Sequence, residues 1–324
     1  MSKNAVSESF QTTPPAGTTA ESAMSLQSAW AHASLATAIW ASNVVAVKFA
    51  LREMPGLTTA LARVTLAGLA LVAVHKLRKL PFALPREEWP GFVALGFFGI
   101  AVSFTFFTCA MQYTSVSHAV FIAALLPIMV MVVAALTGQE RLTASRSIGL
   151  IVAMAGMVML EMDQTVVARG RGVVASNWRG DLMALGGASC FTFFTIRGKQ
   201  LAARYDSGTV NMYAFGLGAM FCAPLLAWIG LTDTPNSLKV NVSEVSWVAW
   251  TSLLISGTAG SALPYYVYYK SLKVLKASQA AALHYVQPVL ATLLGVAFLG
   301  ERLGPQFAVA AALILLGVFI AERR

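Results

Sequence analysis

Ten long apolar runs, separated by short polar segments, dominate this sequence. A helix needs about 20 apolar residues to cross the hydrocarbon core of a bilayer, and it satisfies its own backbone hydrogen bonds there. The runs occupy residues 29–51, 57–76, 89–112, 115–138, 145–162, 181–202, 208–230, 245–270, 275–299 and 304–322. The sequence therefore predicts an all-α integral membrane protein with ten transmembrane helices.

The scarcity of charge supports a membrane environment. Charged residues make up 11% of the chain and hydrophobic residues 57%, whereas about 25% of the residues of a soluble domain are charged. The net charge of +9 would suit nucleic acid, but the basic residues form short clusters between apolar runs, as in membrane proteins with basic cytoplasmic loops. We expect the lipid bilayer as the surrounding partner and no nucleic acid.

Neither the N-terminal tail nor the cysteines are expected to carry chemistry. Residues 1–28 are rich in Ser, Thr, Ala and Pro, which is typical of a disordered tail, and they lack the pattern of a signal peptide. Cys109, Cys190 and Cys222 lie inside apolar runs without metal-type spacing. We expect no disulfide framework, no metal site and no cofactor.

The distribution of basic residues predicts the orientation. With the N-terminus inside, the cytoplasmic segments hold 15 Lys and Arg residues and the outer segments hold 7. The segment 163–180 weakens this bias, because it places three arginines outside. By the positive-inside rule, both termini are expected in the cytoplasm, with the protein in the inner (cytoplasmic) membrane.

An internal repeat divides the chain into two halves. A shift of 161 residues brings Pro127 onto Pro288 and Glu140-Arg141-Leu142 onto Glu301-Arg302-Leu303. Each half, 29–162 and 181–322, then holds five helices, with 163–180 as an extracytoplasmic linker. Because five is odd, the halves are expected to be inverted repeats around a central cavity, a plan that allows alternating access.

The chain resembles the drug/metabolite transporter superfamily of the EamA-domain type, with two EamA repeats over about residues 29–322. The matching residues are Trp40, Asn43, Lys48, Pro55, Arg63 and Ala67, followed by the Pro…Glu-Arg-Leu…Gly pattern that closes each half. The resemblance implies transport of small metabolites, often amino acids, through a central cavity. One departure is Trp40-Ala41 in place of the family's tryptophan-glycine, which leaves the substrate open.

Two cations are candidates for substrate binding. Arg63 lies inside the second run and Lys48 near the outer end of the first, and charges within a bilayer are costly and often functional. Both are predicted to attract a carboxylate or phosphate. The alternative is that they reach the outer headgroups or pair with Glu53.

Acidic residues fall only at the ends of the predicted spans. Exporters of cationic drugs commonly use a buried carboxylate, so the sequence favours neutral, zwitterionic or anionic substrates. His284 and His118 are then the titratable candidates for proton coupling. Uncoupled transport is equally compatible with the sequence.

The stretch "HYVQPVL" is the densest polar segment within an apolar run. Pro288 removes a backbone donor and clashes with the carbonyl of His284, which predicts a kink. His284, Tyr285 and Gln287 are therefore predicted to face the central cavity. Pro127 predicts a matching kink with apolar neighbours, so the site should be asymmetric.

Other residues complete the predicted site and its frame. Trp40, Asn43 and Tyr265 are predicted to reach the cavity, whereas Tyr268 and Tyr269 beside Lys270 suggest an interfacial aromatic belt. Gly149, Ala153 and Gly156 predict a helix-contact surface. The pairs Glu140–Arg141 and Glu301–Arg302 are interpreted as structural markers, each with a carboxylate that suits the N-terminus of the helix after it.

These features predict a secondary transporter, not an enzyme, that moves a small metabolite by alternating access, in the direction of efflux. The substrate is an amino acid or a similar neutral, zwitterionic or anionic compound. The alternatives are a channel or facilitator, or an exporter of drug-like or nucleotide-related compounds. An intramembrane enzyme is disfavoured, because no nucleophile–base or metal-ligand spacing occurs in the sequence. The sequence does not distinguish a monomer from a homodimer.

Overall fold

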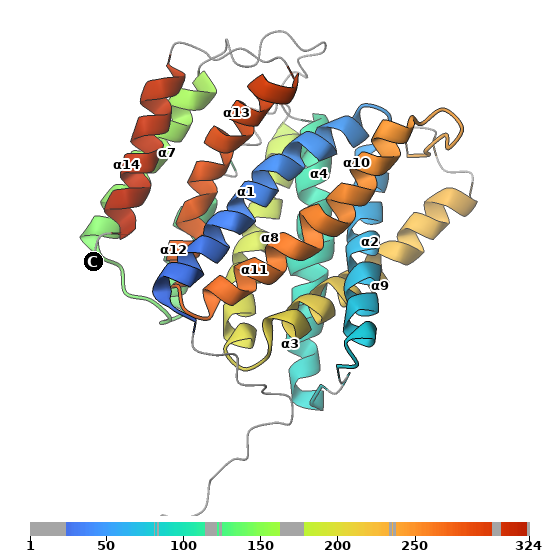
Figure 1. Cartoon of the computed structure of the whole chain (residues 1–324), viewed down its shortest axis with the longest axis horizontal. Coiled ribbons are helices and arrows are strands. Elements are labelled where there is room, and N and C mark those ends of the chain that lie inside the picture. The colour runs from blue at the N-terminus through green and yellow to red at the C-terminus, as the bar shows by residue number, and fades with distance from the viewer. Residues whose placement is uncertain are drawn as a thin grey trace, which may run out of the picture.

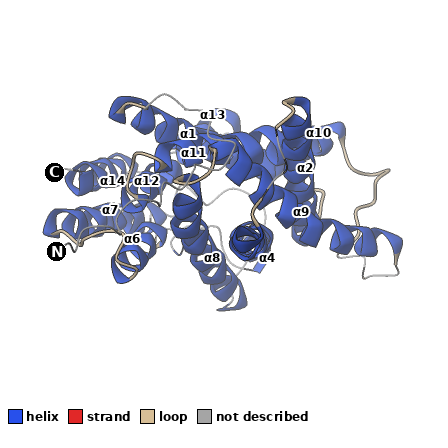
Figure 2. Cartoon of the chain, turned by 90° about the horizontal axis from the view of Figure 1, so that it is seen from below, coloured by secondary structure: helices blue, strands red, loops and turns tan. Residues whose placement is uncertain are grey.

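The computed structural model describes residues 24–80, 82, 84–113, 122, 125–162, 178–232, 235, 238–299 and 306–322. Within these residues the secondary structure is helical, and Figure 2 shows helices and connecting loops without strands. The all-α prediction is therefore confirmed for the part of the chain that the structure describes.

The helices follow the ten apolar runs in order (Figure 1). Five runs form one helix each and the others are divided by 3₁₀ or π turns or are described only in part. The elements are α1 Leu26–Leu51, α2 Gly56–Leu77, η1 Arg86–Glu88, α3 Trp89–Ala94, η2 Leu95–Val102, α4 Ser103–Tyr113, α6 Leu126–Leu136, α7 Ala144–Met162, α8 Trp178–Ala202, α9 Ser207–Leu231, α10 Trp247–Gly257, η3 Thr258–Ala262, α11 Leu263–Leu272, α12 Ala277–Ala282, η4 Leu283–Tyr285, α13 Val286–Leu299 and α14 Phe307–Glu322.

Polar side chains fix several helix starts. Asp206 accepts hydrogen bonds from the N–H groups of Gly208 (2.7 Å) and Thr209 (3.2 Å) at the start of α9. Ser246 caps α10 by accepting from the N–H of Ala249 at 3.3 Å. Such caps satisfy donors that a helix leaves unpaired in its first turn. They mark where the chain turns back into the bundle.

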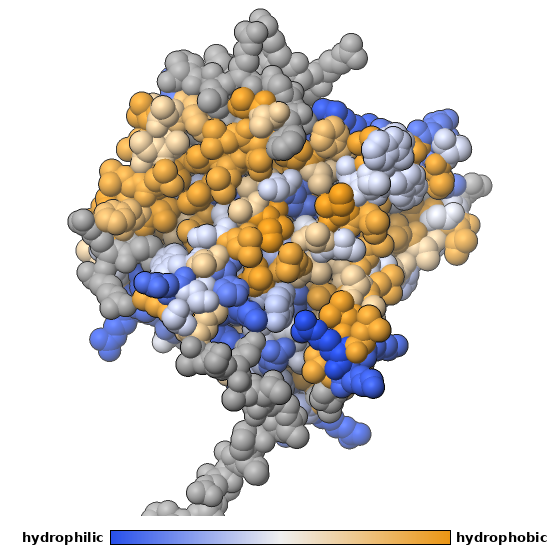
Figure 3. All heavy atoms as spheres, viewed as in Figure 1, coloured by the Kyte–Doolittle hydropathy of each residue, from blue (hydrophilic) through white to orange (hydrophobic). Residues whose placement is uncertain are grey.

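Four segments are long and apolar enough, by length and composition, to cross a membrane: Leu26–Leu51, Gly56–Leu77, Arg86–Ala110 and Ser207–Leu231. Apolar side chains also cover much of the face seen in Figure 3, while hydrophilic residues gather along its lower edge and at its upper right. Leu69, Leu77 and Met220 are among the large apolar side chains that the bundle leaves exposed. Together these features are those of a multi-pass membrane protein.

The helices pack in pairs. The most extensive contacts join α7 to α14, α2 to α9, α4 to α8, and α1 to α10 and α11. In Figures 1 and 2 the α7–α14 pair lies at one end of the molecule and the α2–α9 pair lies toward the other. Gly149 and Gly156 of α7 lie against the backbone of α14, so the predicted small-residue surface does form a helix contact.

Two π-helical segments, η2 and η3, interrupt the third and eighth runs. The shift of 161 residues that aligns the two halves places η3 within η2, and it places Gly257 and Gly260 on Gly96 and Gly99. A Cβ at Gly257 would lie 2.9 Å from the Cβ of Leu66, and one at Gly96 would lie 2.7 Å from that of Leu217. Both π segments therefore lie where helices cross at close backbone contact.

Candidate functional site

A buried cation lies at the centre of the site. Arg63 of α2 is 7% exposed, donates from Nη2 to Ser261 Oγ at 3.5 Å, and has its Cζ 5.3 Å from the ring centroid of Phe104. Within the described residues, its Nε has no hydrogen-bond partner and no carboxylate pairs with the guanidinium. A charge buried without a counter-ion is costly, so this position needs an explanation beyond packing.

Glu53, the alternative partner of Arg63, is engaged elsewhere. Its carboxylate accepts hydrogen bonds from the N–H of Ser246 at 2.6 Å and from Ser246 Oγ at 2.8 Å. These hydrogen bonds hold the pKa of Glu53 below its ordinary value, and the bond from the backbone N–H has the larger effect. Glu53 thus ties the loop after α1 to the start of α10, and it does not neutralise Arg63.

The π segment η3 brings the polar side chains of four helices together. Ser261 Oγ donates to the carbonyl of Ser256 at 2.7 Å, and Asn211 Nδ2 of α9 donates to the carbonyl of Ala262 at 2.9 Å. Asn43 of α1 lies against Gly260, where a Cβ would collide with its amide. Asn43, Arg63, Asn211, Ser256 and Ser261 are buried; with η3 they form what we call the polar π turn. Such distortions of a helix are frequent at functional sites.

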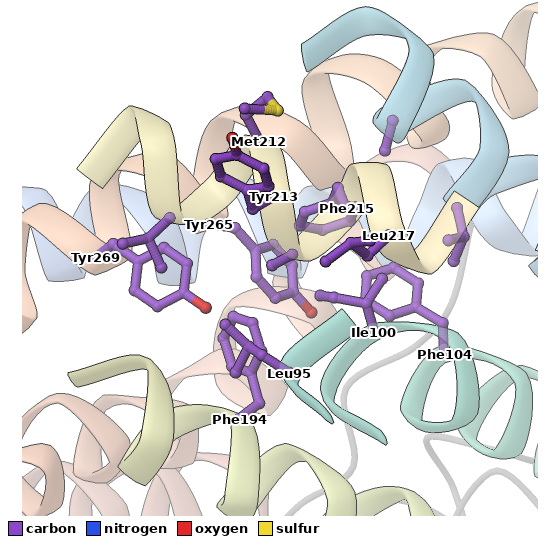
Figure 4. Close-up of a cluster of buried hydrophobic side chains, with 14 of the residues drawn as sticks. Leu95, Ile100, Phe104, Phe194, Met212, Tyr213, Phe215, Leu217, Tyr265 and Tyr269 are labelled. Atoms are coloured by element: carbon purple, nitrogen blue, oxygen red, sulfur yellow. The ribbon is translucent and has the colours of Figure 1, made fainter. Parts of the chain in front are cut away.

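A chain of aromatic rings connects the polar π turn to His284. Phe104 contacts Tyr265 (centroids 5.6 Å apart), Tyr265 contacts Trp40 (5.1 Å), and Trp40 stacks on His284 at 5.1 Å with an interplanar angle of 20°. Figure 4 shows Tyr265 between Phe194 and Phe215, whose ring centroids lie 5.2 and 5.0 Å away. Arg63 and His284 therefore belong to one continuous cluster, with rings between them.

Several buried polar atoms of this cluster have no hydrogen-bond partner. Among the described residues these include Trp40 Nε1, Asn43 Oδ1, Arg63 Nε and His284 Nε2. A buried polar atom left unpaired costs about 1–3 kcal/mol, and such groups are uncommon in folded proteins. The cluster thus offers several donors and the amide oxygens of Asn43 and Asn211 as acceptors to a polar ligand.

The structure brings together five of the residues predicted from the sequence: Trp40, Asn43, Arg63, Tyr265 and His284. It does not bring all the others to this cluster. Gln287 lies at the edge of this cluster, with its Oε1 3.4 Å from His284 Nδ1. Tyr285 is buried in a separate apolar cluster with Met131 and Leu150. Lys48 is half-buried in the last turn of α1, and His118 lies outside the described residues.

The two prolines lie in the first turns of helices. Pro288 is in the first turn of α13, directly after the 3₁₀ turn Leu283–Tyr285, so the helical geometry changes at His284. Pro127 is in the first turn of α6. The change of geometry in the ninth run therefore lies on the N-terminal side of Pro288, where its ring would crowd the preceding carbonyl.

The prediction of an interfacial belt at Tyr268 and Tyr269 is wrong. Both side chains are almost fully buried, at 1% and 0% exposed, because α11 packs against α1, α8 and α9 inside the bundle. Tyr266, on the other face of α11, lies under Lys270 with its ring centroid 4.9 Å from Nζ. Proximity to lysine in the sequence therefore did not indicate an interfacial position.

Asn211, Ser256 and Ser261 are site residues that sequence reasoning missed. The signal was the run of small residues "SGTAGSA" at 256–262, which is unusual within an apolar helix. Small residues usually mark helix contacts in membranes, and the π geometry that turns their backbone toward Arg63 has no clear sequence signature.

A second polar cluster closes one end of the bundle. The Glu140 carboxylate accepts from the N–H of Ser278 at 3.2 Å and from Ser278 Oγ, and it pairs with Arg146 Nη1 at 3.3 Å. We call Glu140, Arg146 and Ser278 the Glu140 latch. Glu140 thus serves the N-terminus of α12 in the other half instead of the α7 that follows it, and Arg146 instead of Arg141 is its partner. Glu301 and Arg302 lie outside the described residues.

Lys199 reinforces the same end of the bundle. Its Nζ donates to the carbonyl of Leu272 at 2.8 Å and to that of Leu275. Leu272 is the last residue of α11, where a helix leaves acceptors unpaired, and Leu275 lies in the turn between α11 and α12. The end of α8, the end of α11 and the start of α12 are therefore joined by charged groups.

Comparison with known proteins places this arrangement in a family. The profile of the EamA-like transporter family matches residues 28–162 and again 178–322. A protein of Archaeoglobus fulgidus named "Uncharacterized transporter" is 25% identical over 295 residues, which cover 91% of this chain and 99% of that one. A "Probable terminal-alkyne amino-acid exporter" of Streptantibioticus cattleyicolor is 26% identical over 294 residues, covering 90% and 92%.

A solved structure shares the fold. The chain titled "Crystal structure of protein" superimposes with a TM-score of 0.70 at 24% identity, and the match covers 91% of this chain and 98% of that one. The resemblance to the EamA type found in the sequence is thus confirmed, and with both halves matched, this chain belongs to the EamA-like transporter family.

Proposed function

We propose that this protein is a secondary transporter that exports a small carboxylate-bearing metabolite, an amino acid or a similar zwitterionic or anionic compound, across the cytoplasmic membrane. Ten transmembrane helices, arranged as two inverted repeats over 29–162 and 181–322 around a central site, carry out alternating access. Residues 163–180 connect the halves outside the cell, and both termini are cytoplasmic.

The helix packing supports the inverted repeat. The contact of α4 with α8 corresponds to the contact of their counterparts, α11 with α1. Two more of the extensive contacts, α2 with α9 and α7 with α14, each join an element to its own counterpart. These four contacts are thus unchanged when the two halves exchange places, as expected for two repeats related by a two-fold axis.

The single observation that carries the substrate class is the buried Arg63, which has no carboxylate partner among the residues that the structure describes. A guanidinium donates two parallel hydrogen bonds to a carboxylate, with geometry that an ammonium cannot match. The cost of keeping this charge in the bundle is offset only when an anion is present. An anionic group of the substrate, bound at the polar π turn, therefore explains why an arginine occupies this position.

The neighbouring groups support a zwitterion over a simple acid. Asn43 Oδ1 is an unpaired acceptor next to Gly260 and is suited to an ammonium or hydroxyl donor. The rings of Trp40 and Tyr265 supply an apolar wall for the rest of the molecule. The name of the Streptantibioticus relative, an amino-acid exporter, agrees with this substrate class.

The Glu140 latch is the proposed cytoplasmic gate. It links the segment before α7 to the start of α12, so it joins the two halves at the end of the bundle that carries Lys199 and Arg146. Breaking the hydrogen bonds between Glu140 and Ser278 would let the halves separate there. Substrate would then reach the aromatic cluster from the cytoplasm.

Counterflow in proteoliposomes tests this function. The purified protein is reconstituted, the vesicles are loaded with one unlabelled solute at a time, and uptake of the labelled solute is followed with and without a pH gradient. The panel contains amino acids, their amides, hydroxy acids, nucleotides and a lipophilic cation. Saturable counterflow of a carboxylate solute supports the proposal, and dependence on the pH gradient shows proton coupling.

Other results would favour the alternatives. Flux that rises linearly with concentration and shows no counterflow would indicate a channel. Counterflow of nucleotides alone would indicate that Arg63 binds a phosphate group instead of a carboxylate, since phosphate is also a bidentate acceptor. Counterflow restricted to the lipophilic cation would contradict the assignment of Arg63.

A further inference from the structure

An apolar groove on the outer surface of the bundle is separate from the polar π turn. It lies between α2, α9 and the start of α3 and has a volume of about 350 Å³. Leu69 and Val72 of α2, Trp89 of α3, and Met212 and Gly216 of α9 are among the residues that line it. Leu69 is 61% exposed, so the groove opens toward the surroundings of the protein.

Two exposed cations stand at one end of this groove. Thr65, Leu69 and Val72 lie on one face of α2, and the next residue on that face, one turn after Val72, is the exposed Lys76. On the opposite wall, Arg86 is exposed and lies one 3₁₀ turn before Trp89. The groove is therefore apolar along its length. Where α2 ends it is flanked by Lys76 and Arg86, with the exposed Glu87 next to Arg86 and with Glu88 paired to Arg204.

An unpaired hydroxyl lies near the charged end. Tyr213 lines the groove and is 6% exposed, and within the described residues its hydroxyl has no hydrogen-bond partner. Its ring contacts Trp89 with centroids 5.9 Å apart. Trp89 is 39% exposed, and tryptophans of this kind prefer the headgroup level of a membrane. Trp89 thus indicates that this end of the groove lies at the headgroup level, whereas the Tyr213 hydroxyl itself is buried.

We propose that this groove binds one anionic phospholipid. An acyl chain lies along the wall from Val72 to Thr65, a length of about 10 Å at the rise of a helix, and the phosphate is held by Lys76 and Arg86. Basic residues at a membrane surface attract anionic lipids, and the groove adds an apolar surface that fixes the chain.

The charge pattern distinguishes a lipid from a second copy of this chain. A phospholipid has one anionic end and one apolar end, in the same order as the groove. A second copy would need an acidic group opposite Lys76 and Arg86 and a long apolar side chain inserted beside Gly216. We therefore assign the groove to a lipid and treat a dimer contact as an outcome that the test can reveal.

Gly216 allows a matched pair of variants. A Cβ at Gly216 meets only Val72 Cγ2 at 3.4 Å, whereas one at Gly230, on the same helix, meets nothing within 4 Å. Gly216→Leu fills the groove, and Gly230→Leu makes the same change elsewhere on α9. Lys76→Gln and Arg86→Gln remove surface charges and leave the fold intact, and Arg141→Gln, in an exposed loop, is their control.

The experiment measures bound lipid and thermal stability. The full-length protein is delipidated in mild detergent and incubated with phosphatidylglycerol or phosphatidylcholine of identical chains, then examined by native mass spectrometry and by its Tm. We expect wild type and Gly230→Leu to retain phosphatidylglycerol about fivefold over phosphatidylcholine and to gain Tm from it. Gly216→Leu should retain neither lipid. The Lys76→Gln/Arg86→Gln double variant should lose the preference.

Several results would overturn the proposal. They are equal retention of lipid by Gly216→Leu and wild type, a preference for phosphatidylglycerol that survives the loss of both cations, and a two-chain species that Gly216→Leu abolishes. The first result would show that the lipid does not bind in the groove. The second would show that Lys76 and Arg86 do not bind the headgroup, and the third would show that a second copy of the chain occupies the groove.

Discussion

The two π segments of this protein share a backbone and differ in chemistry. Both lie at equivalent positions of the repeat, and both pack a pair of glycines against neighbouring helices. Around η3 the side chains are Asn43, Arg63, Asn211, Ser256 and Ser261. A shift of 151 residues, which aligns α1 and α2 with α8 and α9, places the first three on Phe194, Ala214 and Ala60, and the shift of 161 residues places the two serines on Leu95 and Ile100. Each polar residue of one copy is thus replaced by an apolar residue in the other.

This difference separates scaffold from function. If the polar groups were needed to form a π turn at a helix crossing, η2 would need them too, yet it is formed with Leu95 and Ile100 fully buried. The π geometry is therefore a property that the two repeats share, together with the close glycine contacts, and it does not require polar side chains. The polar side chains at η3 are an addition to it, and in the proposed function they provide the site for the anionic group of the substrate.

The largest effect is expected at Arg63. Arg63→Gln removes the charge that distinguishes the two π segments, and kcat/KM for the carboxylate substrate should fall about 100-fold, as when one partner of a buried charge pair is truncated. Arg63→Lys should restore only part of the activity, because an ammonium lacks the planar fork. Initial rates of counterflow measure both variants.

Arg52→Gln is the matched control for Arg63. Arg52 is exposed after α1 and also lies over a phenylalanine ring, 4.8 Å from the centroid of Phe49. The Arg52→Gln variant should transport the substrate at the rate of the wild type. Normal transport by Arg63→Gln would show that the polar π turn does not bind the substrate.

The next effect compares the two glycines. Gly260→Ala forces Asn43 away from η3, and Gly99→Ala forces Phe194, whose Cδ2 would lie 2.9 Å from the new Cβ. Overpacking costs about 1–3 kcal/mol at either site, so both variants should lose Tm. Only Gly260→Ala should also raise KM, by about tenfold, because only that neighbour binds the substrate. An equal rise of KM in both variants would contradict the assignment.

A smaller effect is expected at the Glu140 latch. Glu140→Gln keeps the shape of the side chain but weakens hydrogen bonds to Ser278 and Arg146, which are worth about 1.5–3 kcal/mol each when charged. The cytoplasmic end should open more readily, so a thiol reagent should label an Ala282→Cys reporter faster, while KM changes only a few-fold. The Arg141→Gln variant serves as control, since Arg141 is exposed. Unchanged labelling would exclude the latch as a gate.

Substitution of Lys48 should change transport less than substitution of Arg63, although both residues were predicted to bind the substrate. A shift of 151 residues, which aligns α1 with α8, places Lys48 on Lys199, whose ammonium caps the end of α11. By this equivalence Lys48 serves the scaffold. We expect Lys48→Met to keep KM within about twofold and to lower Tm, as Lys199→Met should also do. A large rise in KM for Lys48→Met alone would place it in the site.

The smallest effect is expected on the pH dependence of stability, at the contact between Glu53 and Ser246. Hydrogen bonds from Ser246 hold the pKa of Glu53 below its ordinary value of 4.5. This contact therefore stabilises the folded protein fully above pH 4.5, and the stabilisation is lost as the pH falls through the lower pKa of the folded state. Glu53 is exposed, so the contribution is small. Wild type should lose slightly more Tm than Glu53→Gln between pH 6 and the acid limit of the assay. Parallel curves would show that the contact contributes nothing.

The sequence predicted the elements better than their geometry. Apolar runs bounded by charges located the helices, because length and hydropathy determine which segments can be helical in a bilayer. The glycines in and next to η2 and η3 lie against residues of other helices, such as Leu66 and Leu217. Such contacts depend on tertiary packing, so the π segments could not be predicted from local sequence.

The site was predictable where charge or resemblance pointed to it. Arg63 was identified because a cation is rare inside an apolar run, and Asn43 because of the family pattern. Asn211 and Ser261 lacked such a signal, since Asn and Ser also serve as ordinary helix contacts. Tyr268 and Tyr269 were misassigned because their proximity to Lys270 suggested an interface, whereas α11 lies inside the bundle.

The most direct test of the polar π turn combines a change in the ligand with a change in the protein. Binding of the transported carboxylate and of its carboxamide is measured by titration calorimetry with wild type and Arg63→Gln, which gives a double-mutant cycle. We predict that wild type prefers the carboxylate by about tenfold or more and that Arg63→Gln has no preference. The same preference in both proteins would contradict the account, because the carboxylate would then be bound elsewhere.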